Sequence, residues 1–307
     1  MDSLELEDNI HIIIGGTFPK CNTLVLLSED SVTLIDPGMA IEDLRQFLKE
    51  FNLEIRDITT VILSHIHPDH ITHAAYIQRL SKCHIVTNEI TAPLFDEKEK
   101  MKDFLGFHKE SLIRPLWEDL VNKRMYGALD TDAKVDHVLL ATEKFDAGGI
   151  ILRPIMTPGH LPDHMCIEFI EQNLVFGADI DCTPFGPYYG HPNSSIPEFR
   201  NSISLLQSLS FKGLISGHLN EPLVQDYKLA LKSYDLQFDL REDFVMMAIT
   251  NGAGTIDEIT LNPIIYRSLT NIVFLYFEKM MIEHHVQSLI EKEAITAKQE
   301  RFVPTRM

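Results

Sequence analysis

The chain has 307 residues, of which 45% are hydrophobic, 45 are acidic and 27 are basic, so its formal net charge is −18. This length and composition predict a soluble globular protein with a large buried core. The negative charge argues against nucleic acid as a partner, because contacts of basic side chains with phosphates normally supply most of that affinity.

The N-terminal stretch and the cysteines bear on location. The acidic start, MDSLELEDN, lacks the basic and apolar regions of a secretory signal. No apolar run approaches the ~20 residues that a membrane helix needs. The four cysteines form no CxxC pair, which argues against a thiolate zinc site and against a disulfide framework. We therefore expect a cytoplasmic protein without membrane contact and with four reduced cysteines: Cys21, Cys83, Cys166 and Cys182.

Strand-like and helix-like segments alternate over the first ninety residues. The helix-like segment is Ile41 to Phe51, whose apolar residues repeat with a period of 3.6. A second helix is expected after residue 72. Runs rich in Val, Ile and Thr predict strands, and they are HIIIGG (11–16), CNTLVLLS (21–28), SVTLIDPG (31–38), ITTVILSH (58–65) and CHIVTN (83–88). The pattern indicates a layered α/β fold.

Residues 93–134 are rich in charged side chains, and LWEDLVNKRMYGAL (116–129) has the pattern of an amphipathic helix. We interpret this region as a helical insertion that could act as a lid. Beyond it we expect a helix over 197–209 and only helices from residue 222 onward. These boundaries predict a first domain over 1–221 and a C-terminal helical appendage over 222–307. Strands are predicted for GGIILRPIM (148–156), HMCIEFI (164–170), NLVFGAD (173–179) and GLISGH (213–218).

The segment VILSHIHPDH (61–70) places four ligand-type side chains within six residues, directly after an apolar run. Such side chains would repel one another or leave hydrogen-bonding capacity unused unless a cation bound them. Imidazole and carboxylate groups suit zinc, iron or manganese. In a loop after a strand, His65 and His67 can point to one centre while Asp69 and His70 point to a second.

Two metals need further ligands, and three strand ends offer them. His160 follows the strand of MTPGH, Asp179 follows LVFGAD, and His218 follows LISGH. Each case has the same order of an apolar strand, a small residue and a ligand. Asp181 competes with Asp179, because GADID contains two acids.

This set resembles the metallo-β-lactamase-fold superfamily, in its glyoxalase II-like and lactonase-like branch. The HxHxDH motif at 65–70, the TPGH at 157–160, the strand-end Asp and the final GH occur in the family's order, over residues 10–220. The resemblance implies an αββα sandwich with a metal site on one edge. The chain departs from the family where DHITHAA replaces the common DHxGG.

The resemblance also implies a role for each ligand. His65, His67 and His160 would bind the first metal, Asp69, His70 and His218 would bind the second, and Asp179 would bridge the two. The bridging Asp of the family usually lies three residues after the aromatic of LFxGD, which favours Asp179 over Asp181. His164, the second His of a TPGHTxGH-like pattern, would support the site without binding metal.

Two adjacent cations would lower the pKa of a bridging water, so that hydroxide forms near neutral pH, and Asp69 would exchange the proton. We therefore expect a dinuclear metal-dependent hydrolase of a small-molecule thioester, lactone or related ester. Two divalent metal ions are implied, with Zn2+ preferred over Fe or Mn. The alternatives are a phosphodiesterase or nuclease of the same fold, and a non-catalytic metal-binding sensor.

The loop DCTPFGPYYGHPNSS (181–195) leaves the edge that carries the ligands. Tyr188, Tyr189 and His191 are predicted to contact substrate there, because phenol and imidazole groups can stabilise an oxyanion. The alternative is a loop stabilised by its own aromatic packing.

The C-terminal stretch resembles the winged-helix-like appendage of some family members but contains no basic stripe. Packing within the chain or homodimer formation is therefore favoured over nucleic-acid binding. His284 and His285 should face different ways on a helix, which argues against a paired metal site.

Overall fold

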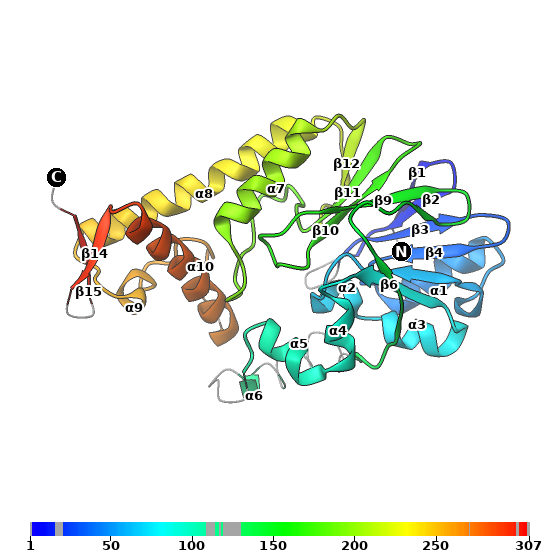
Figure 1. The fold of residues 1–307 in the computed structure, drawn as a ribbon, viewed down its shortest axis with the longest axis horizontal. Coiled ribbons are helices and arrows are strands. Elements are labelled where there is room, and N and C mark those ends of the chain that lie inside the picture. Colours follow the sequence, from blue (N-terminus) through cyan, green and yellow to red (C-terminus); the bar gives the residue numbers. More distant parts are fainter. Residues whose placement is uncertain are drawn as a thin grey trace.

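The computed structural model describes residues 2–15, 21–108, 114–116, 118, 130–269, 271–298 and 301–305. Two β-sheets pack face to face, and helices cover the outer face of each sheet (Figure 1). This arrangement confirms the αββα sandwich.

The first sheet has seven strands that follow one another in chain order. Its first four strands are antiparallel and the remaining ones are parallel to one another. The strands are β1 (Ser3–Glu7), β2 (Ile10–Ile13), β3 (Thr23–Leu27), β4 (Val32–Ile35), β5 (Thr60–Ile62), β6 (His84–Asn88) and β7 (Val135–Leu139).

The second sheet has six strands in the order β13-β12-β11-β10-β9-β8. All its pairs are antiparallel except β11 with β12. The strands are β8 (Phe145–Asp146), β9 (Ile151–Met156), β10 (Met165–Phe169), β11 (Leu174–Ala178), β12 (Gly213–Ser216) and β13 (Leu223–Val224).

Apolar side chains from both sheets fill the space between them. Ile12 and Leu24 of the first sheet and Ile167 and Phe176 of the second belong to one buried cluster. Alternate residues of a strand point to opposite faces, so each sheet contributes one face to this cluster and the other to a helical layer. The helical layers are α1 (Ile41–Glu50) and α3 (Ala74–Ser81) on the first sheet, and α7 (Ile196–Ser208) with part of α8 (Tyr227–Thr250) on the second.

The strands that precede the predicted ligands end at one edge of the sandwich. β4 and β5 are parallel to each other, and β9, β11 and β12 run in one direction because β10 is antiparallel to both of its neighbours. The turn after each carboxyl end therefore reaches the same edge. The short helices η1 (Ile55–Asp57) and α2 (Pro68–Ile71) lie next to β5 in the sequence.

In the described part of the insertion there are three short helices, which are α4 (Ala92–Asp96), α5 (Lys98–Phe104) and α6 (Arg114–Leu116). Most of the amphipathic helix predicted over 116–129 lies outside the described residues. Phe107 stacks beside Tyr276, with ring centroids 6.2 Å apart, and Tyr276 belongs to α10 (Ile272–Glu291). The insertion therefore contacts the C-terminal part of the chain.

The prediction of helices alone after residue 221 is wrong in two places. β13 joins the second sheet, and β14 (Ile295–Lys298) pairs with β15 (Arg301–Pro304) as a hairpin beyond α9 (Ile256–Ile259) and α10. In the hairpin, Thr296 lies opposite Val303, and Ala297 lies opposite Phe302. Such short strands are stabilised by cross-strand contacts, which a search for helical periodicity does not detect.

All four cysteines are free, and only Cys182 is partly exposed. Among the described residues, no helix combines the length and the apolar character that a membrane span requires.

A buried carboxylate joins α10 to the segment before it. Glu278 is 0% exposed. Its Oε1 accepts hydrogen bonds from the backbone N–H groups of Ile264 and Ile265, at 2.6 and 3.1 Å, and its Oε2 accepts one from Tyr266 at 2.9 Å. These bonds hold α10 in place, and α10 carries side chains that reach the metal-binding edge.

We predict that Glu278→Ala lowers the free energy of unfolding by about 3 kcal/mol, because three backbone donors lose their acceptor inside the protein. The matched control is Glu283→Ala on the exposed side of the same helix, for which we expect a loss below about 0.5 kcal/mol. Urea unfolding followed by circular dichroism measures both. Equal effects of the two substitutions would show that the bonds of Glu278 add no stability.

Candidate metal centre

The loop after β5 is fixed by two buried carboxylates. The backbone N–H of Ser64 donates to Asp36 Oδ1 at 2.8 Å, and the backbone N–H of Ile66 donates to Asp163 Oδ2 at 2.8 Å. Pro68 then starts α2, in the first helical turn where a missing N–H costs nothing. The histidines of the loop are therefore presented from a rigid backbone.

The structure brings all seven predicted metal ligands together. They form two groups, within each of which the candidate ligand atoms lie within 4.8 Å of one another. Six of the seven residues are buried, and His218, with 20% of its side chain exposed, is the most open to solvent. The first group is His65, His67, His160 and Asp179, and the second is Asp69, His70 and His218.

Asp179 lies between the two groups with one oxygen toward each. Its Oδ1 lies 2.7 Å from Nε2 of His70 and 3.0 Å from Nε2 of His218. Its Oδ2 lies at 3.0, 3.5 and 3.7 Å from ligand nitrogens of the first group, which belong to His160, His67 and His65. This is the position of a bridging ligand.

Asp181, the competing acid, is engaged elsewhere. Its Oδ1 accepts hydrogen bonds from the backbone N–H and the hydroxyl of Thr183, at 3.0 and 3.1 Å. It belongs to neither ligand group among the described residues. The geometry therefore favours Asp179 as the bridge.

Asp36 sets the protonation of two histidines. His70 donates from Nδ1 to Asp36 Oδ2 at 2.7 Å. The Ser64 hydroxyl donates to the same oxygen at 2.6 Å, so that it can accept the Nδ1–H of His65 at 2.9 Å. In the neutral form of each ring, Nε2 consequently carries a lone pair directed at the ligand groups. Sequence reasoning missed Asp36, although TLIDPG has the same order of apolar strand and strand-end acid.

His191 and the backbone set the tautomers of two further histidines. His191 donates from Nδ1 to the carbonyl of Leu105 at 2.9 Å, so its Nε2 accepts from Nε2 of His67 at 2.7 Å. His67 therefore presents Nδ1 as a lone pair. His160 donates from Nδ1 to the carbonyl of Tyr188 at 2.8 Å and presents Nε2.

These tautomers place lone pairs against one another. Nε2 of His160 and Nδ1 of His67 are 2.9 Å apart. Nε2 of His65 is buried and makes no hydrogen bond with any residue that the structure describes. Buried polar atoms without a partner cost free energy, and a cation at the centre of each group would remove that cost. The donor set therefore fits a metal ion.

The electrostatics differ between the two groups. In the second group burial alone would lower the pKa of His70 and of His218, but nearby acidic groups, Asp179 among them, raise the pKa of both, so a metal bound there would displace protons. In the first group the electrostatics agree with the fit. Burial lowers the pKa of His65 and of His67 well below the ordinary value, which keeps both imidazoles neutral, as metal ligands must be. Burial alone would raise the pKa of Asp179, but the surrounding histidines, His70 first, hold it well below its usual range. Asp179 is therefore charged.

His164 supports the bridging acid through the backbone. Its Nε2 accepts the N–H of Asp179 at 3.1 Å, and its Nδ1 lies 2.9 Å from the Thr157 hydroxyl. It is in neither ligand group among the described residues. This placement matches the supporting role expected from the sequence.

The three residues expected to contact substrate occupy different environments. The ring of Tyr188 lies beside those of His67 and His160, with both centroids at 5.8 Å, and Phe277 of α10 packs against it at 5.6 Å. Tyr188 is therefore part of the wall of the site. His191, as described above, lies behind His67 with both ring nitrogens bonded.

Tyr189 points away from this wall into the core. It is fully buried, and its hydroxyl lies 2.7 Å from His285 Nε2 and accepts from Arg241 Nη1 at 3.3 Å. The expected contact of Tyr189 with substrate is corrected to a structural role, because neither its ring nor its hydroxyl is open to a ligand.

His284 and His285 face different partners, as their adjacency on a helix predicts. His284 donates from Nε2 to the carbonyl of His191 at 2.9 Å, whereas His285 contacts Tyr189. The C-terminal helix thus reaches the site through the loop that follows Asp179.

Comparison with known proteins finds relatives that are named as metallo-beta-lactamase-fold proteins or as metal-dependent hydrolases. A metallo-beta-lactamase fold-containing protein of Sulfurisphaera tokodaii is 24% identical over 175 residues, covering 55% of this chain and 61% of that protein. A protein of Bacillus velezensis named "Probable polyketide biosynthesis zinc-dependent hydrolase BaeB" is 25% identical over 190 residues, covering 61% of this chain and 66% of its own. The chain thus spans less than two thirds of the length of these curated relatives.

A solved structure shares the whole fold. The crystal structure of a metallo-beta-lactamase family protein from Thermus thermophilus aligns with a TM-score of 0.76 at 18% identity, over 98% of this chain and 100% of that one. The sequence model of the metallo-beta-lactamase superfamily matches residues 16–245. Since this range holds every member of both ligand groups, from His65 to His218, the chain belongs to the metallo-beta-lactamase superfamily.

Proposed function

We propose that this protein is a dinuclear, zinc-dependent hydrolase of an uncharged small-molecule thioester, lactone or related ester. The carrying observation is the convergence of imidazole lone pairs on both oxygens of Asp179, which leaves two adjacent places for cations. Two divalent cations bound there would lower the pKa of a water molecule and polarise a carbonyl oxygen.

The choice of zinc rests on the donor set. Each group combines imidazole nitrogens with carboxylate oxygens, and thiolates are absent from both groups in the described part of the chain. Such a set suits zinc, and also iron or manganese. The Bacillus velezensis relative is named as zinc-dependent, which supports zinc first.

Asp69 is the group placed to exchange a proton with the reacting water. Its Oδ2 lies 3.8 Å from Nε2 of His218 and 3.9 Å from Nε2 of His70, with 12% of its side chain exposed. Burial raises the pKa of Asp69 above its ordinary value, which suits a carboxylate that accepts a proton and returns it to a leaving group.

The charges at the site support this substrate class. Within the described part of the chain, the ion pairs of the seven ligand residues involve only histidines and aspartates. No arginine or lysine joins these pairs to neutralise a phosphodiester. A phosphodiesterase or nuclease is therefore a weaker candidate than an esterase. The third candidate is the non-catalytic metal-binding sensor.

We predict that the zinc-loaded protein hydrolyses members of a thioester and lactone panel faster than phosphodiesters. Asp69→Ala should lower kcat/KM on the best substrate by roughly 100-fold to 10,000-fold, the range for loss of a general acid–base group. The exposed Asp96→Ala is the control. Faster phosphodiester cleavage would favour the second candidate, and no turnover by fully loaded protein would favour the sensor.

We predict that Asp179→Ala loses at least one of two metal ions, because both groups lose an oxygen donor. Asp181→Ala, the matched acid two residues away, should retain both. Metal content by plasma mass spectrometry after zinc loading and dialysis measures the stoichiometry. If Asp181→Ala loses a metal ion while Asp179→Ala keeps both, Asp181 is the bridging residue instead.

We predict that His191→Leu weakens zinc affinity by ~10-fold to ~100-fold, the usual effect of losing a partner that orients a ligand. The Nε2–H of His67 then has no acceptor. His191→Gln should restore part of the affinity through its side-chain carbonyl, and His84→Leu at an exposed strand position is the control. Competition with a chromophoric chelator measures each affinity, and equal values for all four proteins would leave His191 without this role.

A further inference from the structure

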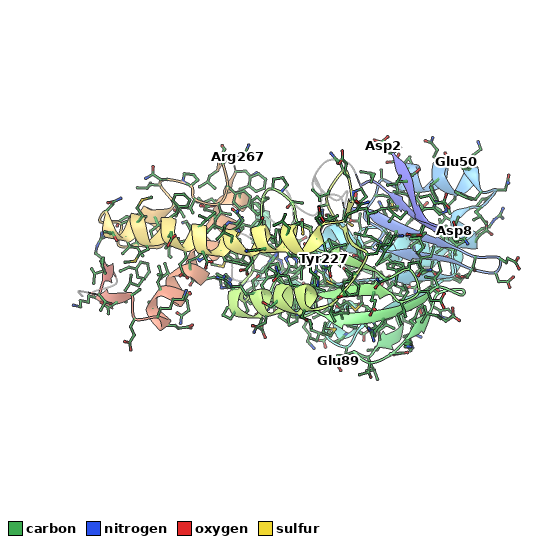
Figure 2. The ribbon with its side chains drawn as sticks, turned by 90° about the horizontal axis from the view of Figure 1, so that it is seen from above. Asp2, Asp8, Glu50, Glu89, Tyr227 and Arg267 are labelled. Carbon is green, nitrogen blue, oxygen red and sulfur yellow. The ribbon has the colours of Figure 1, made fainter. Side chains whose placement is uncertain are left out.

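The outer face of α8 carries an exposed apolar stripe. Five large side chains on this 24-residue helix are between 41 and 66% exposed, and they are Leu229, Leu236, Leu240, Phe244 and Met247. Figure 1 places α8 along an outer edge of the molecule, and Figure 2 shows the ribbon of α8 in front of the neighbouring elements. A contiguous exposed apolar surface of this kind marks an interaction site.

The opposite face of α8 is already filled. Tyr234, Phe238 and Val245 are buried there, and Arg241 donates hydrogen bonds to the loop that follows Asp179. The packing of α8 against the rest of the chain therefore does not involve the stripe.

The spacing of four of the five stripe residues is symmetric. Leu229, Leu236, Leu240 and Met247 are separated by seven, four and seven residues, so the order reads the same in both directions. Two copies of α8 packed antiparallel across a twofold axis would bring Leu229 of one copy against Met247 of the other. Leu236 would likewise meet Leu240. Intervals of three, four and seven residues keep side chains on one face of a helix, as helix–helix packing requires.

Two charges beside the stripe complement each other in the same register. Lys232 and Asp243 are exposed, lie on the same flank of the stripe, and form no ion pair with any residue that the structure describes. In the antiparallel arrangement Lys232 of each copy faces Asp243 of the other, so the pair forms twice. A parallel twofold arrangement would place the two flanks on opposite sides of the interface, so this pair would not form. The charge pattern therefore selects a second copy of this chain as the occupant.

We propose that α8 forms the interface of a homodimer, with two copies of the helix antiparallel about a twofold axis near Phe238. The interface is isologous, because one stripe meets itself. The proposal does not depend on the proposed hydrolase activity, since it concerns a surface outside the ligand groups and its test measures mass.

The test is light scattering after gel filtration, together with sedimentation equilibrium, on the full chain. The expected mass is close to twice the 35.1 kDa of one chain. Leu236→Asp combined with Leu240→Asp should give a monomer with an unchanged circular dichroism spectrum. Leu261→Asp, at a position that is 78% exposed and off the stripe, should remain a dimer.

Charge exchange tests the register. Lys232→Glu and Asp243→Lys should each raise the dimer dissociation constant by at least ~10-fold, and the double variant should recover the original value. A wild-type chain that stays monomeric would overturn the proposal and leave the stripe to a different protein. Dissociation of Leu261→Asp, or no recovery in the double variant, would overturn this interface.

Discussion

The charged carboxylate of Asp179, surrounded by imidazole nitrogens, is the interaction on which the arrangement of the site depends. A buried carboxylate is costly unless cations or hydrogen-bond donors compensate it. Here its two oxygens face five histidines, and its backbone is held from both sides. His164 accepts the N–H of Asp179, and the Tyr234 hydroxyl donates to its carbonyl at 3.0 Å. The acid therefore cannot turn away from the histidines that it joins.

The histidines are in turn oriented by groups from separate parts of the chain. Asp36 at the end of β4 fixes two of them, and the loop carbonyl of Tyr188 fixes a third. A carbonyl within the insertion, that of Leu105 directly after α5, fixes His67 through His191. In the neutral form of each ring, these bonds leave the ligand nitrogen as a lone pair. The fold thus orients the rings toward the ligand groups before any metal binds.

The convergence of the seven candidate ligands could be predicted because they follow apolar strands, and strand ends gather at one edge of a layered sheet. The supporting residues could not, since the link from Leu105 through His191 to His67 spans three distant segments. Tyr188 and Tyr189 are adjacent and chemically alike, yet only the fold decides that one faces the site and the other the core. The hairpin near the C-terminus was missed for a similar reason, because its strands are stabilised by each other and not by local periodicity.

The C-terminal helices contact the loop that follows Asp179 and so help to position the site. Tyr234 and Arg241 of α8 hold the backbone on both sides of the loop, and His284 and Phe277 of α10 hold its far end. Because one face of α8 makes these bonds, a shift of α8 would also move the backbone of Asp179. Its other face can bind a second molecule at little structural cost, because the bonds to the loop leave from the opposite side. Association through that outer face would therefore stiffen α8 without altering the ligand geometry.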